Sequence, residues 1–391
     1  MRVGPDAFFH LTYCTNIHPG ESWSEVESNL IRYTLPLKDR LSPDNDFGVG
    51  LRLSNQAARH LIGGDHLQRL REWLDEQGLY VFTLNGFPYG SFHRQIVKDH
   101  VYNPDWRTQE RVDYTLILAD VLAALLPSGL EGSISTSPIS YKPWLSDASA
   151  DDARKAGAKN LIAVSAKLND LYDRTGTLIH IGIEPEPDCL IENTAETVDY
   201  FEKYLFSSSS QEEADSIQRH IRICYDTCHF AVEFEDPAET LARFDSAGIL
   251  LSKVQISSAL RVLLGQDRDA LAADLQPFAE STYLHQVVGR SAEGRLSHYP
   301  DLPAALPQLE TSRDVEWRVH YHVPIFTDGV ERLLSTQVDI TDALDDIIPN
   351  RRCPHLEIET YTWDVLPAEL KTDAVTSIGR EFDWILGQIT G

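Results

Sequence analysis

The chain has 391 residues, of which 42% are apolar, and its 60 acidic side chains outnumber its 34 lysines and arginines to give a formal charge of −26. The apolar share is enough for a large core and excludes a disordered chain, and the length fits one large barrel with insertions or two ordinary domains. A surface this acidic repels phosphate backbones and anionic lipid, so we expect no nucleic-acid partner.

The cysteines and the first residues of the chain indicate in which cellular compartment the protein is located. The five cysteines are scattered and odd in number, which does not fit a disulfide framework. Residues 1–20 lack the basic start and long apolar core of a secretory signal. No apolar run approaches the ~20 residues of a membrane-spanning helix. We therefore expect a cytoplasmic protein with no direct membrane insertion.

Apolar runs that end in turn residues alternate with amphipathic segments along most of the chain, which predicts alternating strands and helices. The eight predicted strands are 8–14, 47–53, 80–84, 132–136, 179–184, 221–226, 249–255 and 356–359. This alternation predicts an α/β fold, a single (β/α)8 TIM barrel that covers residues 1–391. The rival prediction is a two-domain α/β chain that divides near residue 260.

Two long connections interrupt the alternation. Between the seventh and eighth strands, the runs 283–288 and 316–326 predict further strands. We expect them to form an inserted antiparallel segment between strands 7 and 8, at about residues 260–335. The loop 88–108 is also long, and long loops in compact domains tend to be lids or binding loops. We expect both segments to cover the mouth of the barrel.

Four predicted strands end in a side chain that carries an oxygen donor. Glu184, Asp226 and Glu359 end the fifth, sixth and eighth strands, and Gln255 ends the seventh. Because the carboxyl ends of barrel strands form the active-site face, these side chains should meet there. Carboxylate and amide oxygens suit a divalent metal ion: Mn2+, Mg2+, Fe2+ or Zn2+. The alternative at any single strand end is an acid that caps the next helix.

Three histidines extend this set of candidate metal ligands. His229 follows Asp226 in a D-x-x-H pattern, in which the carboxylate can bind a metal while the imidazole faces the substrate or a second ion. His320 and His322 flank a tyrosine in a predicted strand, so both imidazoles should lie on one face of it. This spacing is typical of metal ligands, although two histidines of a protein core would have the same pattern.

These residues carry a resemblance to the xylose isomerase-like TIM barrel superfamily, which contains sugar phosphate isomerases, epimerases and endonuclease IV. The segment 184–187, E-P-E-P, resembles the E-P-K-P segment of xylose isomerases, with Glu186 in place of the lysine. The order Glu, D-x-x-H, Gln255, Glu is similar to that of ketose epimerases, which have a histidine where this chain has the glutamine.

The resemblance implies a reaction. Glu184 and Glu359 would act as base and acid in a proton transfer next to a carbonyl, and the metal would stabilise the enediolate that forms. His229 would orient or polarise a substrate oxygen. Glu186 in place of lysine disfavours a hydride shift. The competing functions are an endonuclease IV-like metal hydrolase or lyase and a non-catalytic metabolite-binding protein on the same barrel.

A second resemblance covers nearly the whole chain. The segments N-G-F-P-Y-G, V-Y-N-P-D-W, Y-D-T-C-H and E-T-Y-T-W, which begin at residues 85, 101, 225 and 359, are similar to the EboE family of bacterial metabolite traffic proteins. That resemblance implies a sugar- or cyclitol-like metabolite as substrate and a functional link to a UbiA-like prenyltransferase. It leaves the reaction and the oligomeric state open.

Five further residues are candidates for contact with the substrate. Arg52 and Lys142 lie in or near loops that should face the site, where one could hold a substrate phosphate, although surface cations are the simpler interpretation. Asn85 follows the third predicted strand, His93 lies in the long loop after it, and Trp363 could form part of an apolar wall.

Overall fold

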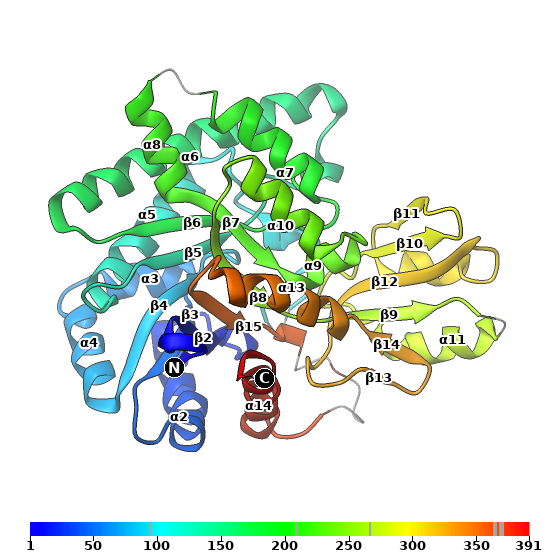
Figure 1. The fold of residues 1–391 in the computed structure, drawn as a ribbon, viewed down its shortest axis with the longest axis horizontal. Helices are drawn as coiled ribbons and strands as arrows, with labels where there is room; N and C mark the ends of the chain where they lie inside the picture. The colour runs from blue at the N-terminus through cyan, green and yellow to red at the C-terminus, as the bar shows by residue number, and fades with distance from the viewer. Residues whose placement is uncertain (94, 208–209, 266, 363–365, 367–370, 391) are drawn as a thin grey trace.

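The computed structural model describes residues 1–391 except 94, 208–209, 266, 363–365, 367–370 and 391. Its centre is a nine-stranded sheet with the order β1-β2-β15-β8-β7-β6-β5-β4-β3, in which every pair except β1 with β2 is parallel (Figure 1). The strands are β1 (Arg2–Val3), β2 (Phe9–Tyr13), β3 (Phe47–Arg52), β4 (Leu79–Asn85), β5 (Gly132–Thr136), β6 (Ile179–Ile183), β7 (Ile221–Asp226), β8 (Leu251–Ile256) and β15 (His355–Ile358). The predicted barrel strands on both sides of residue 260 therefore belong to one sheet.

Strands β2 and β3 meet and nearly close this sheet into a barrel. An isolated parallel bridge joins Cys14 to Gly50. Thr12 Oγ1 donates to Gly48 O at 2.8 Å and accepts from Gly50 N at 2.9 Å, so a side chain supplies the bonds that a regular ladder would make. A Cβ at Gly50 would lie 1.9 Å from a carboxylate oxygen of Glu357 in the barrel interior, which explains the glycine.

Helices follow the barrel strands and cover the outside of the sheet (Figure 1). They are α1 (Trp23–Asn29), α2 (Leu35–Leu41), α3 (Asn55–Leu61), α4 (His66–Gln77), α5 (Gln109–Leu125), α6 (Asp147–Thr175), α7 (Thr194–Tyr200), α8 (Gln211–His220), α9 (Thr227–Val232), α10 (Pro237–Ser246), α13 (Gln337–Asn350) and α14 (Ala374–Thr390). Local sequence signals determine where several of these helices begin or end. Ser22 and Glu25 form a capping box at α1, and Gly78 ends α4 in the left-handed region with φ of 62°.

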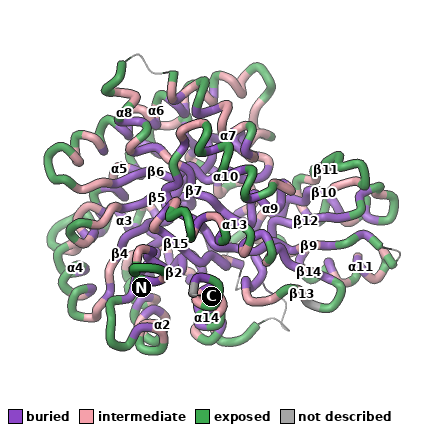
Figure 2. Tube along the Cα trace, viewed as in Figure 1, coloured by how far each residue is buried: buried purple, intermediate pink, exposed green. Residues whose placement is uncertain are grey.

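The barrel strands are buried along nearly their whole length, whereas the outer faces of the helices are exposed (Figure 2). Apolar side chains of the strands and helices form one continuous core, in which Ile181 of β6 and Ile223 of β7 share a cluster with Leu118 of α5 and Leu161 of α6. Burial of apolar surface on this scale is the main stabilising contribution. Because this core stabilises the fold, the ends of the strands can carry polar side chains.

A second sheet lies between β8 and α13 and projects from one side of the barrel (Figure 1). It has six strands in the order β11-β10-β12-β9-β14-β13, and its pairs are antiparallel. Its elements are β9 (Ala259–Leu263), α11 (Arg268–Leu275), β10 (Val287–Ser291), β11 (Leu296–Tyr299), α12 (Leu302–Ala305), β12 (Asp314–His322), β13 (Gly329–Val330) and β14 (Leu333–Ser335). The antiparallel segment that the sequence predicts is therefore present, with six strands in place of two.

The strand predicted at 283–288 is wrong in position, because it overlaps β10 by only two residues. The backbone N–H of Tyr283 donates to the Glu280 carboxylate, and that of His285 donates to Asp301. Side-chain acceptors thus take the bonds that a strand ladder would use. This segment turns toward the mouth of the barrel.

Candidate metal centre

Three carboxylates meet where barrel strands end. Glu184 follows β6, Asp226 is the last residue of β7, and Glu359 follows β15. One carboxylate oxygen from each lies within 4.8 Å of the other two, and the residues are only 3%, 0% and 5% exposed. Ionised acids held this close and away from water repel one another. The group therefore suits a bound cation.

Asp226 divides its two oxygens between the fold and the site. Oδ1 accepts from the backbone N–H groups of Cys228 and His229 at 2.8 and 3.2 Å, and so caps helix α9. Ser257 Oγ donates to the same oxygen at 2.5 Å. Oδ2 has no hydrogen-bond partner in the described part of the chain. The helix cap and the candidate metal ligand, which are alternatives in the sequence, are combined in this one side chain.

Glu359 and Glu184 are held differently. Glu359 Oε1 accepts from the side-chain amides of Asn16 at 2.6 Å and Asn85 at 3.1 Å. Glu184 Oε2 has no partner among the described residues. Burial raises the pKa of both carboxyls well above the usual range, and the charges of the neighbouring acids raise these pKa values further. A positive ion among the three acids would oppose this shift.

Gln255 lies in β8, where it is opposite Asp226 of β7 and Glu357 of β15. It is fully buried, and neither its Nε2 nor its Oε1 has a hydrogen-bond partner among the residues that the structure describes. A buried amide that makes no hydrogen bond costs free energy. Its oxygen is therefore available to a metal ion or a substrate.

Three imidazoles lie beside the carboxylates, each with one nitrogen engaged. Nδ1 lies 2.8 Å from a backbone carbonyl oxygen in both His229 and His322, and 2.9 Å from Gln286 Oε1 in His320. Because carbonyl oxygens only accept, Nδ1 carries the proton and Nε2 keeps its lone pair. This is the tautomer in which a histidine binds a metal through Nε2.

The free nitrogens face one another and the acids. His229 Nε2 lies 3.1 Å from His320 Nε2 and 3.8 Å from Asp226 Oδ2. Two lone pairs at this distance repel unless a proton or a metal ion lies between them. Burial, followed by the nearby imidazoles, lowers the pKa of His320 well below its usual value, which disfavours the proton. Imidazole nitrogens together with carboxylate oxygens suit a borderline divalent ion.

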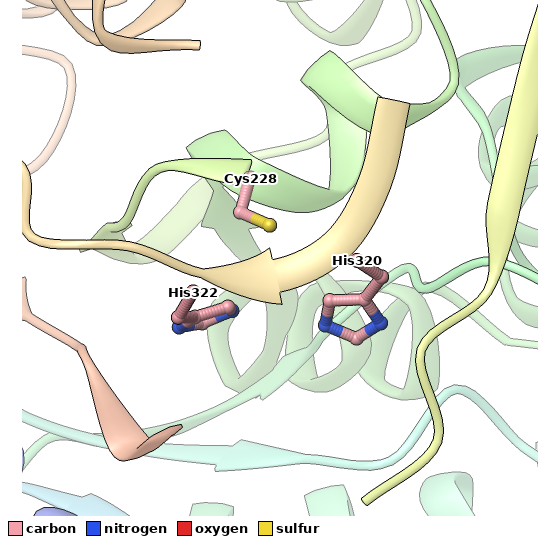
Figure 3. Close-up of side chains that lie close together, drawn as sticks. All are labelled: Cys228, His320 and His322. Atoms are coloured by element: carbon pink, nitrogen blue, oxygen red, sulfur yellow. The ribbon is translucent and has the colours of Figure 1, made fainter. Parts of the chain in front are cut away.

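Figure 3 shows His320 and His322 on one face of β12, as their spacing predicts, with Cys228 of α9 close by. Burial raises the pKa of the Cys228 thiol well above its usual value, so this sulfur is a neutral and weaker ligand than the imidazoles. Donor atoms within 4.8 Å of one another form four overlapping groups here: Glu184–Asp226–Glu359, Asp226–His229–His322, Glu186–His229–His320 and Cys228–His320–His322.

A cavity of about 60 Å³ lies against these side chains. Its polar wall includes Glu184, Glu186, His229, His320 and Glu359, and the rest of the lining is mainly apolar: Phe87, Pro88, Phe92, Val97, Val101, Tyr283, Leu284 and Tyr361. This volume exceeds the ~10–15 Å³ that one water molecule needs, so the cavity has room for more than one water.

Most of the apolar wall comes from the two segments that the sequence predicts as covers, the loop 88–108 and the inserted segment. Phe92, from the loop 88–108, packs against Tyr283 and Tyr361 with ring centroids 5.2 and 5.6 Å away. Val97 N donates to Thr282 O at 2.7 Å. The loop after β4 and the segment before β10 thus contact each other over the cavity.

Of the candidate substrate contacts, Asn85 lines the cavity, where its amide holds Glu359. His93 is buried in the same loop as Phe92, and its ring centroid lies 5.0 Å from that of Phe92. Trp363 lies outside the described residues.

Arg52 and Lys142 pair with carboxylates outside the cavity lining. Arg52 Nη1 donates to Glu21 Oε1 at 3.0 Å and thereby holds the loop after β2. Lys142 Nζ lies 3.0 Å from Glu192 and 2.8 Å from Glu196. In this structure both cations therefore form ion pairs with carboxylates of the protein.

Sequence reasoning treats Glu186 only as a replacement for lysine, and it misses Asn16. Glu186 lines the cavity, its Oε1 accepts from Tyr102 Oη at 2.8 Å, and burial raises its pKa to about 7. Its place in the E-P-E-P run is a signal that could have identified it. No local pattern marks Asn16, which reaches Glu359 from a polar loop.

Solved structures align with nearly the whole chain. A xylose isomerase-like TIM barrel protein from Mycobacterium smegmatis, in complex with magnesium, matches with a TM-score of 0.51 at 12% identity, over 98% of this chain and 97% of that one. The probable 3-DHS dehydratase AsbF from Bacillus anthracis matches with a TM-score of 0.48 at 12% identity, over 96% and 98%. The first match shows that the chain has the xylose isomerase-like TIM barrel fold, and at this identity the likeness concerns the fold alone.

No protein-family model and no curated protein sequence matches the chain. The resemblance to EboE proteins, with its implied link to a UbiA-like prenyltransferase, is therefore not supported by these comparisons. Within the described ranges, no helix has both the length and the apolar character needed to cross a membrane.

Proposed function

We propose that the protein is a divalent-metal-dependent isomerase or epimerase that transfers a proton next to the carbonyl of a small, sugar- or cyclitol-like substrate. The observation that carries this proposal is the meeting of Glu184, Asp226 and Glu359 at the carboxyl ends of the barrel strands, where Glu184 and Glu359 line a cavity. In barrels of this kind that end of the sheet is where chemistry takes place.

Glu184, Asp226 and Glu359 would hold the ion, with Gln255 Oε1 as a further oxygen donor and His229, His320 and His322 as nitrogen donors beside it. Four atoms without a hydrogen-bond partner among the described residues support this assignment: Glu184 Oε2, Asp226 Oδ2, Gln255 Oε1 and His322 Nε2. When bound, the ion supplies electrostatic stabilisation for negative charge that develops on a substrate oxygen. The magnesium in the Mycobacterium smegmatis structure is consistent with an ion in this fold.

Glu184 and Glu359 are the residues proposed to move the proton. They follow β6 and β15, which are separated in the sheet by β7 and β8, so they reach the cavity from two sides. Two amides orient Glu359, whereas Glu184 Oε2 has no partner among the described residues and can accept a proton. His229, fixed through Nδ1, presents Nε2 to a substrate oxygen or to a second ion.

The cavity favours a substrate without a phosphate group. Lys98 is the cationic side chain among the described lining residues, and its Nζ already pairs with Asp301 at 2.6 Å. A phosphate would therefore meet acids and apolar side chains rather than a free cation. The aromatic wall suits the apolar face of a sugar or cyclitol ring.

The overlap of the donor groups favours one alternative. A site with room for several ions suits phosphodiester hydrolysis, as in endonuclease IV-like enzymes. The formal charge of −26 opposes this function, because little counterion release is available to drive DNA binding. Nicking of duplex DNA that contains an abasic site would favour the hydrolase over the isomerase. A chain that binds a metabolite without any metal would favour a non-catalytic carrier.

The test uses the full chain, purified without chelator, with its metal content measured. A panel of ketoses and cyclitol ketones is incubated with the protein in D2O, and NMR follows deuterium entry at the carbon next to the carbonyl. We expect exchange with the wild type and a loss on the order of 10²–10⁴ in rate for Glu359→Gln, which removes the acid–base group. The amide retains an oxygen donor, so this variant should keep its metal.

The exposed Glu27 of α1 provides a matched control, since Glu27→Gln makes the same chemical change at a residue that does not line the cavity. Its exchange rate should equal that of the wild type. Exchange that remains unchanged in both Glu184→Gln and Glu359→Gln, with metal still bound, would overturn the assignment of these two residues.

A further inference from the structure

A second cluster of possible ligands lies where the barrel meets the inserted sheet. Glu192 lies in the loop between β6 and α7, Glu233 follows α9, and His298 belongs to β11. One donor atom from each lies within 4.8 Å of the other two. None of the three is among the residues that line the cavity described above. Nothing in the proposed reaction uses this cluster.

Glu233 is the member of this cluster that lacks a partner. It is 5% exposed, and its Oε1 makes no hydrogen bond within the described ranges of the chain. Burial, followed by the charge of Glu192, raises its pKa to about 9. A carboxylate buried without a partner costs free energy, which either a proton or a cation can relieve. The imidazole of His298 beside it favours a metal ion, because a proton would need no such donor.

The charges around the cluster also call for a cation. Lys142 is the nearby basic side chain, and its Nζ is shared between Glu192 at 3.0 Å and Glu196 at 2.8 Å. Asp188 also faces Glu233 and raises its pKa, and Asp188 Oδ2 has no partner in the described structure. One lysine does not balance this many acids, so the cluster has an excess of acidic groups that a bound cation would offset.

We propose that Glu192, Glu233 and His298 bind a divalent transition-metal ion, separate from the centre at the barrel mouth. Two carboxylates with one imidazole suit Zn2+ or Mn2+ better than Ca2+ or Mg2+, which prefer oxygen donors alone. Tetrahedral ligands at ~2.0–2.2 Å from Zn2+ lie roughly 3.3–3.6 Å apart. The three donor atoms here lie within 4.8 Å of one another, so the side chains would move closer together when the ion binds.

The ion would tie the inserted sheet to the barrel. Its three ligands come from two barrel loops and from the β10–β11 hairpin, in which His298 pairs with Val288. The residue after Glu233, Phe234, is already held by the same sheet: its ring lies 4.3 Å from the Arg290 guanidinium and 4.4 Å from that of Arg318. The ion and this aromatic contact would thus both hold the inserted sheet against the barrel at one junction.

The junction is connected to the metal centre at the barrel mouth. Strand β10 pairs with β12, which carries His320 and His322 at its end. Fixing the hairpin against the barrel would therefore restrict the strand that presents these two imidazoles. The ion proposed here acts as a structural clamp rather than as a participant in the reaction.

The test counts Zn2+ bound to the full-length chain after equilibrium dialysis. We expect His298→Ala and Glu233→Gln each to bind one ion fewer per chain than the wild type. His298 is exposed, so its replacement leaves the core intact, and this variant decides the question if Glu233→Gln fails to fold. His100→Ala, at another exposed histidine, is the matched control and should bind as many ions as the wild type.

Hydrogen exchange supplies the second readout. In the wild type and in His100→Ala, Zn2+ should slow exchange in the hairpin 287–299, and in His298→Ala it should not. Equal ion counts in the wild type and His298→Ala would overturn the proposal, as would Zn2+ protection of the hairpin that persists in His298→Ala.

Discussion

Two layers of the barrel interior hold buried acids in opposite ways. In the lower layer, Lys253 of β8 and Glu357 of β15 are both 0% exposed and form an ion pair at 2.5 Å. In the upper layer, two residues further along the chain in each case, Gln255 and Glu359 take the corresponding places. The upper layer thus has an amide where the lower layer has a lysine.

This difference shows how one barrel separates a structural layer from a layer that is open to a ligand. Burial alone would lower the pKa of Lys253, but the charge of Glu357 raises it above the usual value, so the lower pair is internally neutral. The upper layer gathers three acids without a lysine of its own. The negative charge of these acids is therefore available to a bound cation.

Breaking the lower pair should have the largest effect. Glu357→Gln leaves the Lys253 ammonium buried without a counter-charge, and removing one partner of such a pair typically costs about 3–5 kcal/mol. We expect a loss of that order in the free energy of unfolding, measured by urea denaturation. The double variant Lys253→Met with Glu357→Leu removes both charges and should recover most of it. A single variant as stable as the wild type would show that the pair contributes little.

Converting the upper layer into a copy of the lower one should abolish metal binding. Gln255→Lys places an ammonium among Glu184, Asp226 and Glu359, where it would replace the ion. We expect metal affinity at this centre to fall on the order of 100-fold or more, beyond the usual effect of a residue around the ligands. Gln255→Glu is the matched control and should retain the metal. The measurement is a chelator competition assay in the His298→Ala background, which isolates this centre.

Should Gln255→Lys bind metal as tightly as the wild type, the three acids would not be the ligands. A folded variant is required for this conclusion, and near-ultraviolet circular dichroism provides the check. The fold should survive, because Lys253 two residues earlier shows that β8 already accommodates a lysine when acids surround it.

The contrast between the layers also explains what could be predicted from the sequence. Parallel strands buried on both sides are mainly apolar runs, and a strand was therefore expected at 179–184, where β6 is found at Ile179–Ile183. The same logic identified the strand ends at Glu184, Asp226 and Glu359, because an acid after an apolar run is a local signal.

Features that depend on distant contacts were not predictable in this way. Helix α9 has only six residues and begins at a strand end, so it offers too little periodicity to detect. Strands β11 and β14 have only four and three residues, too few for a clear pattern, and each is paired with a neighbouring strand. Asn16 and Gln286 enter the site through side-chain contacts across the fold, which no spacing along the chain reveals.

Glu381 is a buried carboxyl outside both layers, and its environment predicts how stability depends on pH. Glu381 of α14 accepts from Thr360 Oγ1 at 2.7 Å and has neither a lysine partner nor an acid cluster among the described contacts, and burial raises its pKa to about 7. The unfolded value is ~4.3, so the folded state holds the proton more tightly. This stabilisation is complete below about pH 4 and is lost as the pH rises through 7.

Glu381→Gln cannot ionise, and it should remove this part of the pH dependence. In the wild type the stability should fall by at most ~1.4 kcal/mol for each pH unit between pH 5 and 7, beyond the slope of the variant. Urea denaturation at pH 5, 6, 7 and 8 measures both profiles. Parallel profiles for the two proteins would show that Glu381 titrates at its ordinary value.

The smallest expected effect concerns how the upper layer is oriented. Asn16 donates to Glu359 Oε1 at 2.6 Å, and Asn85 donates to the same oxygen at 3.1 Å. Removing a residue that orients a metal ligand costs about 10–100-fold in metal affinity. Because Asn85 remains in place, we expect Asn16→Ala to lower the metal affinity by about tenfold, the lower end of this range. The same chelator competition assay measures it. Asn45→Ala, at an exposed asparagine, should leave the affinity unchanged. A wild-type affinity in Asn16→Ala would mean that Asn85 alone orients Glu359, and the loop after β2 would then only fill space beside the site.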